Sequence, residues 1–182
     1  MRRPAPAFAL MSALLLALLG SGACGTPRPA AGPVNAQDVM FTQMMVPHHR
    51  QGIEIAKLGA TRGRTPEVRT LAAAVAATQQ DEVEMMLRWL HAWEQPLAAP
   101  SGAHDHRGGP PETDRRQIAA LARSRTFDRD FLNLLIAHQD DAIQMAGIEV
   151  ARGADPAARS WAERVRESRR AQIAQMKSLL SG

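Results

Sequence analysis

The chain has 182 residues, of which 45% are hydrophobic, 22% charged and 4% aromatic, and it contains no tyrosine. This length suits one medium domain or two small ones, and the hydrophobic share is sufficient for a core. The scarcity of aromatic residues argues against a β-sandwich or barrel, whereas the abundance of Ala, Leu, Met, Gln, Glu and Arg favours helices. The net charge of +4 is small and does not indicate nucleic acid as a partner.

The first 23 residues are typical of an export signal. Arg2 and Arg3 provide a positively charged start, residues 9–19 are almost entirely apolar, and small residues follow as far as Ala23. The apolar run is shorter than a transmembrane helix requires. We therefore predict that residues 1–23 are a signal peptide and that the protein is extracytoplasmic.

Cys24, the only cysteine of the chain, follows this segment directly and cannot form an internal disulfide. Its position resembles the lipobox of bacterial lipoproteins, although Ser21 stands where leucine is typical. The resemblance implies lipidation of Cys24 and a membrane anchor, with plain secretion as the alternative. Residues 24–35, rich in proline, glycine and alanine, are then expected to be a flexible tether.

Residues 36–182 contain an internal repeat at a separation of 90 residues. No gap is needed to align the two copies, which indicates a duplicated structural unit. The identical pairs include Asp38 and Asp128, Phe41 and Phe131, His48 and His138, Gly63 and Gly153, Pro66 and Pro156, and Met86 and Met176. We place repeat one at residues 36–95, a linker at 96–125 and repeat two at 126–182.

Each repeat is predicted to be a helical hairpin. Apolar residues and His48 recur at spacings of four and three from Phe41 to Ile55, which is the pattern of a packed helix. A glycine ends the first helix of each hairpin, and a capping residue followed by proline begins the second. A short helix is expected near residues 115–124. Two hairpins that bury their apolar faces against each other make an all-α, four-helix bundle.

Methionine and histidine gather near the start of repeat one, in the order Met44, Met45, His48 and His49. Of the nine methionines, two lie in the signal segment and five of the others lie in repeat one. Thioether sulfur and neutral imidazole suit Cu(I) and ions of similar softness. Outside the cytoplasm thiols oxidise, and these side chains remain usable as ligands. The alternative is that the methionines fill the core and the histidine is simply hydrogen-bonded.

The second helix of repeat one carries Gln79 and Glu82 on its otherwise apolar face. With the turn centred near Gly63, His48 is expected level with Gln79, and Met44 near Glu82. Buried polar groups need hydrogen-bond partners, so we expect His48 to be the partner of both.

Three segments carry a family resemblance: Asp38 to Ala56 with its Met-x-Pro-His-His core, Gln79 to Glu82, and Met86 to Leu90. They look like the domain-of-unknown-function family 305, and the resemblance covers nearly all of the chain after the signal segment. It implies an exported protein with a ferritin-like bundle, and a link to periplasmic copper binding in some members. The candidate ligands for Cu(I) or Ag(I) are Met44, Met45, His48, His49, Glu82 and Met86.

Repeat two departs from this family pattern. Gln139 replaces the second histidine after His138, and the residues before it are not methionine. Arg169 is expected close to the level of His138, where a fixed cation opposes metal binding. We therefore expect repeat two to keep the fold without a ligand set. His104 and His106 in the linker are interpreted as part of a solvated loop.

The predicted function is copper sequestration or transfer without catalysis, with the metal ion and the membrane as partners. The alternative is an envelope scaffold or interaction lipoprotein that binds no metal. A di-iron enzyme would need Glu-x-x-His motifs, and none occurs. Nucleophilic catalysis has no support, because Cys24 lies at the export junction and the chain has no serine elbow motif. The sequence identifies no protein partner.

Overall fold

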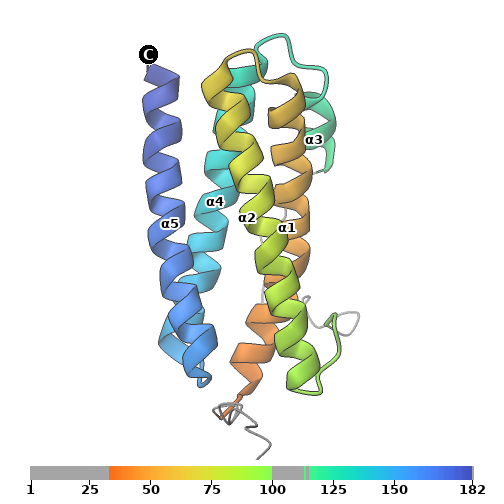
Figure 1. Ribbon diagram of the computed structural model, residues 1–182, viewed down its shortest axis with the longest axis vertical. Coiled ribbons are helices and arrows are strands. Elements are labelled where there is room, and N and C mark those ends of the chain that lie inside the picture. Colours follow the sequence, from red (N-terminus) through yellow and green to blue (C-terminus); the bar gives the residue numbers. More distant parts are fainter. Residues whose placement is uncertain (1–32, 100–112, 114, 182) are drawn as a thin grey trace, which may run out of the picture. The chain divides into compact units, whose positions relative to one another are not determined.

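The computed structural model describes residues 33–99, 113 and 115–181. Within these ranges the chain forms helices and no strand (Figure 1). The helices are α1 (Ala36–Arg62), α2 (Pro66–Ala92), α3 (Arg115–Leu121), α4 (Phe127–Arg152) and α5 (Pro156–Ser181). The all-α prediction is therefore confirmed. The predicted signal peptide, Cys24, most of the tether and the linker histidines lie outside the described residues.

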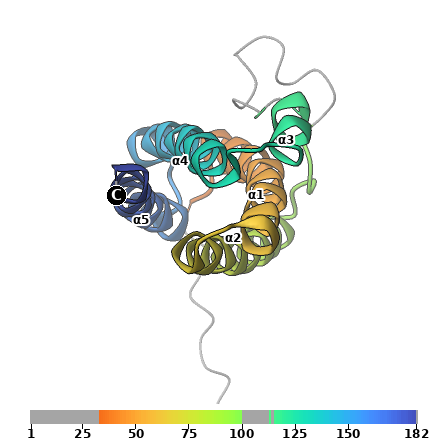
Figure 2. The same ribbon diagram turned by 90° about the horizontal axis from the view of Figure 1, so that it is seen from above.

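The four long helices form two antiparallel hairpins, α1 with α2 and α4 with α5, and the hairpins meet mainly where α1 packs against α4. Seen from above, α2, α1, α4 and α5 follow one another around a common interior, and α3 lies outside them (Figure 2). Helices α2 and α5, at the two ends of this series, are not among the closely packed pairs. The arrangement is consistent with the predicted four-helix bundle.

Local capping explains where the two hairpins turn. The side chain of Thr65 accepts a hydrogen bond from a backbone N–H of the first turn of α2, and Asp155 does the same for α5. In both helices the next residue is proline, whose missing N–H is not needed at that position. Gly63 and Gly153 are the C-caps of α1 and α4, as predicted from their positions.

Two carboxylates join the hairpins in equivalent ways. Asp128, at the start of α4, accepts a hydrogen bond at 3.0 Å from the N–H of Thr65 in the first hairpin's turn. Asp38, at the start of α1, accepts one at 3.0 Å from the N–H of Asp155 in the second hairpin's turn. Each repeat therefore binds the turn of the other through the same residue type, which sets their register.

Two apolar clusters fill the interior, one toward each end of the helices. The first includes Phe127, Phe131 and Met176, and the second includes Phe41 and Trp161. Buried polar residues lie between the two clusters along three of the helices, namely Gln79 in α2, His138 and Gln139 in α4, and Arg169 in α5. The site described below is this polar region.

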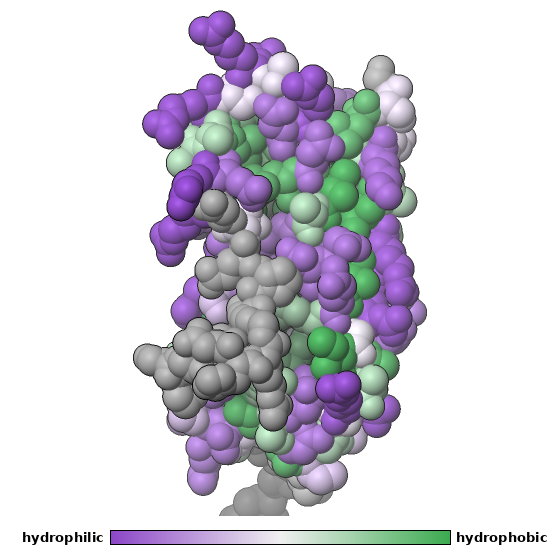
Figure 3. All heavy atoms as spheres, turned by 180° about the vertical axis from the view of Figure 1, so that it is seen from behind, coloured by the Kyte–Doolittle hydropathy of each residue, from purple (hydrophilic) through white to green (hydrophobic). Residues whose placement is uncertain are grey.

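The surface is mostly hydrophilic on the face shown in Figure 3, where apolar side chains emerge in a narrow band between polar ones. Among the described residues, the large hydrophobic side chains with the greatest exposure are Val34, Leu97 and Ile148. None of the described helices combines the length and the apolar character that a membrane span needs.

Candidate functional site

Eight polar side chains, two from each long helix, come together in the interior, and we call this group the polar layer. Six of them are buried, whereas Glu82 and Gln172 are partly exposed. The members are His48, His49, Gln79, Glu82, His138, Gln139, Arg169 and Gln172. Because each member has a counterpart 90 residues away, the layer is built from four equivalent pairs.

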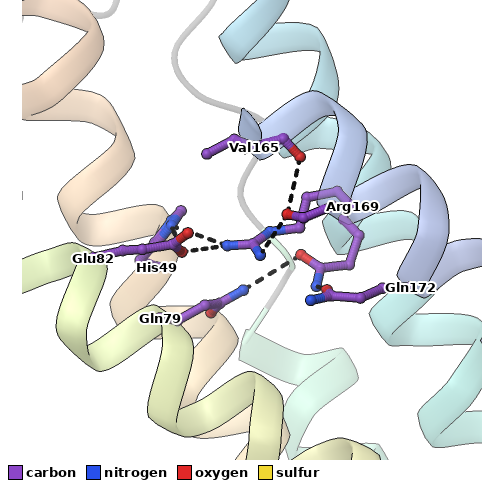
Figure 4. A network of polar contacts seen from close by, with 8 residues as sticks. His49, Gln79, Glu82, Val165, Arg169 and Gln172 are labelled. Atoms are coloured by element: carbon purple, nitrogen blue, oxygen red, sulfur yellow. Dashed lines mark hydrogen bonds and ion pairs between the residues drawn. The ribbon is translucent and has the colours of Figure 1, made fainter. Parts of the chain in front are cut away.

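The charged half of the layer joins the two hairpins. Oε2 of Glu82 lies 2.8 Å from Nε2 of His49 and also forms an ion pair with Nη2 of Arg169 (Figure 4). A carboxylate only accepts hydrogen bonds, so Nε2 of His49 carries the ring hydrogen. The lone pair of this imidazole is then on Nδ1, which is buried without a hydrogen-bond partner. The carboxylate thus fixes the tautomer that leaves Nδ1 free to act as a metal ligand.

The electrostatics of this pair keep His49 neutral and Glu82 charged. Burial lowers the pKa of His49, although its hydrogen bond to Glu82 opposes the shift. Burial raises the pKa of Glu82, but the hydrogen bond from His49 and the charge of Arg169 outweigh it and hold that pKa below its usual value. At neutral pH the group therefore consists of one anion, one cation and a neutral imidazole.

The other half of the layer repeats this geometry with uncharged side chains. Nε2 of Gln139 donates to Oε1 of Gln172, and Nε2 of Gln79 donates to Oε1 of Gln139 at 3.3 Å. These glutamines occupy the positions 90 residues away from the charged group. Three glutamines therefore form an uncharged network at the positions equivalent to His49, Glu82 and Arg169.

His48 and His138 stack face to face at the centre of the layer, with ring centroids 3.9 Å apart. Neither ring nitrogen of His48 has a hydrogen-bond partner. Nδ1 of His138 lies 3.2 Å from the hydroxyl of Thr113, and its Nε2 has no partner. Burial is the main cause that lowers the pKa of both rings, and that of His138 falls to about 3. Both imidazoles are therefore neutral at neutral pH.

Gly52 provides the space beside these rings. A Cβ atom at this position would lie 2.1 Å from Oε1 of Gln79 and 2.5 Å from Nε2 of His138. Both atoms are buried and lack hydrogen-bond partners. The absence of a side chain at Gly52 thus allows three helices to bring polar atoms close to one another.

The predicted sulfur ligands belong to the second apolar cluster or pack against it. Met45 and Met86 are fully buried in the second apolar cluster, and Met44 packs against that cluster from a partly buried position. The ring of His49 is 6.1 Å from that of Trp161, which belongs to the same cluster. Trp161, the aromatic neighbour of His49, therefore belongs to the same apolar cluster as Met45 and Met86.

The side chains available to a metal ion at His49 and in the second apolar cluster offer sulfur and nitrogen rather than carboxylate oxygen. Across the described residues, no three His, Cys, Asp or Glu side chains are grouped as a metal site of those ligands would need. The carboxylate of Glu82 is already shared by His49 and Arg169. A metal held here would therefore need methionine sulfur together with imidazole nitrogen, a donor set that fits Cu(I) and Ag(I).

The family model described as domain of unknown function (DUF305) matches residues 38–180. The chain belongs to the DUF305 family. This confirms the resemblance drawn from the Met-x-Pro-His-His core. No curated protein matches the sequence of this DUF305 chain.

Several solved structures share the fold of this DUF305 protein. A DUF305 protein from Streptomyces coelicolor matches with a TM-score of 0.75 and 26% identity, over 80% of this chain and 92% of that one. A DUF305 fragment from Deinococcus radiodurans matches with a TM-score of 0.72 and 26% identity, over 82% and 98%. CopM in its Cu(I)-bound form matches with a TM-score of 0.68 and 29% identity, over 79% and 95%. CopM has also been solved with Cu(II), with silver and in the apo form.

One expectation about this DUF305 protein is wrong: His48 is not the partner of Gln79 and Glu82. Glu82 binds His49 and Arg169, Gln79 donates to Gln139, and the nitrogens of His48 are left without partners. Two residues at the same height along a hairpin need not face each other, because the direction of each side chain also depends on the rotation of its helix. The second hairpin, moreover, provides partners that compete with those in the first.

Sequence reasoning also missed residues that the fold adds to the site. Arg169 and Gln139 contact Glu82 and Gln79 from repeat two, for which the sequence predicts the fold without a ligand set and Arg169 near the level of His138. Met145, which is 6% exposed, belongs to the same apolar cluster as Met45 and Met86. The repeat points to Gln139 and Arg169, because they are the counterparts of His49 and Gln79. It gives no such signal for Met145, whose counterpart is Ile55.

Proposed function

We propose that this DUF305 protein is an exported, lipid-anchored and non-enzymatic four-helix bundle of the ferritin-like type that binds Cu(I) or Ag(I) for sequestration or transfer. The observation that carries the proposal is the free Nδ1 of His49. It is buried without a partner, on a ring whose other nitrogen is held by Glu82. Met45 and Met86 lie in the cluster that this ring adjoins.

In this proposal Met44, Met45, His48, His49 and Met86 are the ligands of the metal ion. Glu82 orients His49 through Nε2, as carboxylates commonly do behind a metal-bound histidine. A buried, neutral imidazole binds a metal ion without first losing a proton. Several sulfur and nitrogen donors in an interior that excludes water favour a soft ion that gives up its hydration readily.

The amino-terminal sequence supports the proposed location. Residues 1–23 have the charge and hydropathy of a signal peptide, and Cys24 follows where a lipoprotein would be acylated. The structural relative from Streptomyces coelicolor is described as a candidate secreted protein. CopM, which is 29% identical over 79% of this chain, has been solved with Cu(I) bound.

Anaerobic titration with Cu(I) against a chromophoric chelator tests the metal site. We expect the purified protein to bind about one equivalent, and Met45→Leu/Met86→Leu to weaken binding at least about tenfold, because thioether ligands are lost at nearly constant volume. Met176→Leu is the matched control, since Met176 is equally buried but lies in the other apolar cluster. His49→Gln tests the imidazole, with Gln139 as evidence that glutamine fits at the equivalent position.

The outcomes separate the two functions predicted from the sequence. Binding that the methionine pair and His49→Gln weaken, and that Met176→Leu leaves unchanged, supports copper handling. Absence of binding by the unmodified protein would overturn the proposal, and the methionines would then be core residues of an envelope scaffold.

A further inference from the structure

Arg169 is a fully buried cation within the region proposed to hold a metal ion. Its Nη2 pairs with Oε2 of Glu82 and lies 3.5 Å from Nε2 of His49, while its Nε has no hydrogen-bond partner. Burying a guanidinium is costly unless an anion compensates its charge. Figure 4 shows the two side chains reaching toward each other from α2 and α5. The carboxylate of Glu82 is therefore committed to this pair.

The fold itself does not require a charge at this position. Gln79 is the counterpart of Arg169 in repeat one, and its amide donates to Gln139, which in turn donates to Gln172. That network joins α2, α4 and α5 without any ion pair, whereas the charged group joins α1, α2 and α5. The buried charge of Arg169 therefore calls for an explanation other than packing.

We propose that Arg169 reserves the metal site for soft monovalent ions by withholding the carboxylate of Glu82 from the metal. This inference rests on the proposed function. Divalent ions such as Zn²⁺ and Cu²⁺ bind well to imidazole combined with carboxylate, whose negative charge offsets theirs. With Glu82 neutralised by Arg169, the ligands left to a metal are uncharged thioethers and imidazoles. Cu(I) and Ag(I) accept such ligands and bring one charge into the interior rather than two.

The charge of the metal ion adds to the preference for monovalent over divalent ions. The free energy needed to bring an ion into a medium of low dielectric constant rises with the square of its charge, so a divalent ion depends much more on a nearby anion. Without Arg169, the negative charge of Glu82 would remain uncompensated beside His49, whose Nε2 it contacts. We therefore expect the residue at position 169 to decide whether the site is neutral or carries a negative charge.

Parallel titrations with Ag⁺ and Zn²⁺ test the inference, and neither ion changes its oxidation state during them. Arg169→Gln installs the side chain found at the equivalent position of repeat one. It should raise Zn²⁺ affinity at least about tenfold and leave Ag⁺ affinity within about threefold. Glu82→Gln/Arg169→Gln should lose the gain in Zn²⁺ affinity, because no carboxylate remains. Arg170→Gln is the control, since Arg170 is adjacent and exposed and loses the same charge.

The possible results have distinct meanings. If folded Arg169→Gln binds Ag⁺ but gains no Zn²⁺ affinity, the role of Arg169 is overturned and the proposed function stands. If the unmodified protein does not bind Ag⁺, the proposed function falls and this inference falls with it. A Zn²⁺ gain that persists in the double variant would also overturn the role assigned to Glu82.

A second variant keeps the inference testable should Arg169→Gln fail to fold. Gln139→His/Gln172→Glu rebuilds the histidine–carboxylate pair in repeat two, where Gln79 rather than an arginine stands behind it. With this carboxylate free and His138 adjacent to the new histidine, Zn²⁺ affinity should rise at least about tenfold. No rise in this variant would overturn the inference.

Discussion

The imidazole rings of His48 and His138 lie face to face, with centroids 3.9 Å apart and planes inclined by 10°. They occupy equivalent positions in the two repeats, so the stack joins α1 to α4. Two imidazolium ions at this separation would repel each other strongly in a buried environment. The contact therefore depends on both rings remaining neutral.

Acidification is expected to destabilise the protein through this stack. In the unfolded chain a histidine binds a proton near pH 6.5, whereas burial keeps the folded rings neutral and lowers the pKa of His138 to about 3. The stabilisation is fully present above about pH 6.5 and is lost as the pH falls toward about 3. Its slope is at most about 1.4 kcal/mol per pH unit for each ring. Free energies of unfolding from urea titrations between about pH 4 and pH 7 measure this slope.

Two histidine variants identify the source of the slope. His138→Gln should reduce it, and His91→Gln should not, because His91 is exposed. An acid slope that His138→Gln leaves unchanged would show that the stack does not cause it.

For Glu149 we expect a pH dependence of folding stability with the opposite sign. Its side chain is buried, and burial, together with the neighbouring Asp38 carboxylate, raises its pKa to about 8. The folded state thus favours the protonated acid. The stabilisation from this group is fully present below about pH 4.5 and is lost as the pH rises through about 8. Glu149→Gln, which mimics the protonated form, should raise the thermal unfolding midpoint near pH 8.5.

The control for this experiment is Glu54→Gln, which changes an exposed carboxylate on α1. The midpoint of Glu149→Gln should also vary less between about pH 5 and pH 8 than that of the unmodified protein. Equal shifts in the two variants would mean that net charge, rather than the burial of Glu149, controls this part of the profile.

Replacing either of two glycines, Gly52 in α1 and Gly147 in α4, by alanine should change the stability of the protein in opposite directions. A Cβ at Gly52 would lie 2.1 Å from Oε1 of Gln79, whereas a Cβ at Gly147 would lie 4.0 Å from its nearest neighbour, Nε of Arg166. Gly147→Ala should therefore be stabilising by up to about 1 kcal/mol, since alanine favours helix. Gly52→Ala should be destabilising by about 1–3 kcal/mol, because the polar layer must shift. Chemical denaturation of both variants measures the difference, and similar effects at the two sites would contradict tight packing at Gly52.

The ion pair of Glu82 and Arg169 should show strong coupling in a double-mutant cycle. Arg169→Gln leaves a carboxylate without its cation, and the expected loss of unfolding free energy is about 3 kcal/mol. Glu82→Gln/Arg169→Gln should recover at least about 1 kcal/mol of that loss, because it also removes the carboxylate left without its cation. Free energies of unfolding for the single and double variants give the coupling energy. Additive losses would mean that the two side chains do not stabilise each other.

Much of the fold was predictable because its signals are local or periodic. Thr65 and Asp155 cap helices through atoms only three residues away, and Gly63 and Gly153 end the preceding helices. The repeat of 90 residues determined that both halves form the same hairpin. The stretch from Met44 to His49 likewise identified the part of the chain that carries the candidate ligands.

Which polar side chains meet was decided by the tertiary structure. Periodicity identifies the inward face of a helix but not its rotation relative to helices of another hairpin, so His48 was paired with the wrong residues. The ion pair of Glu82 with Arg169 and the stack of His48 on His138 each join residues about 90 apart in sequence. The sequence by itself determined which residues have the chemistry to bind a soft metal. Only the packing of the two hairpins decided which of those atoms are left without partners, because a buried donor or acceptor is paired only where a neighbouring helix presents a partner to it.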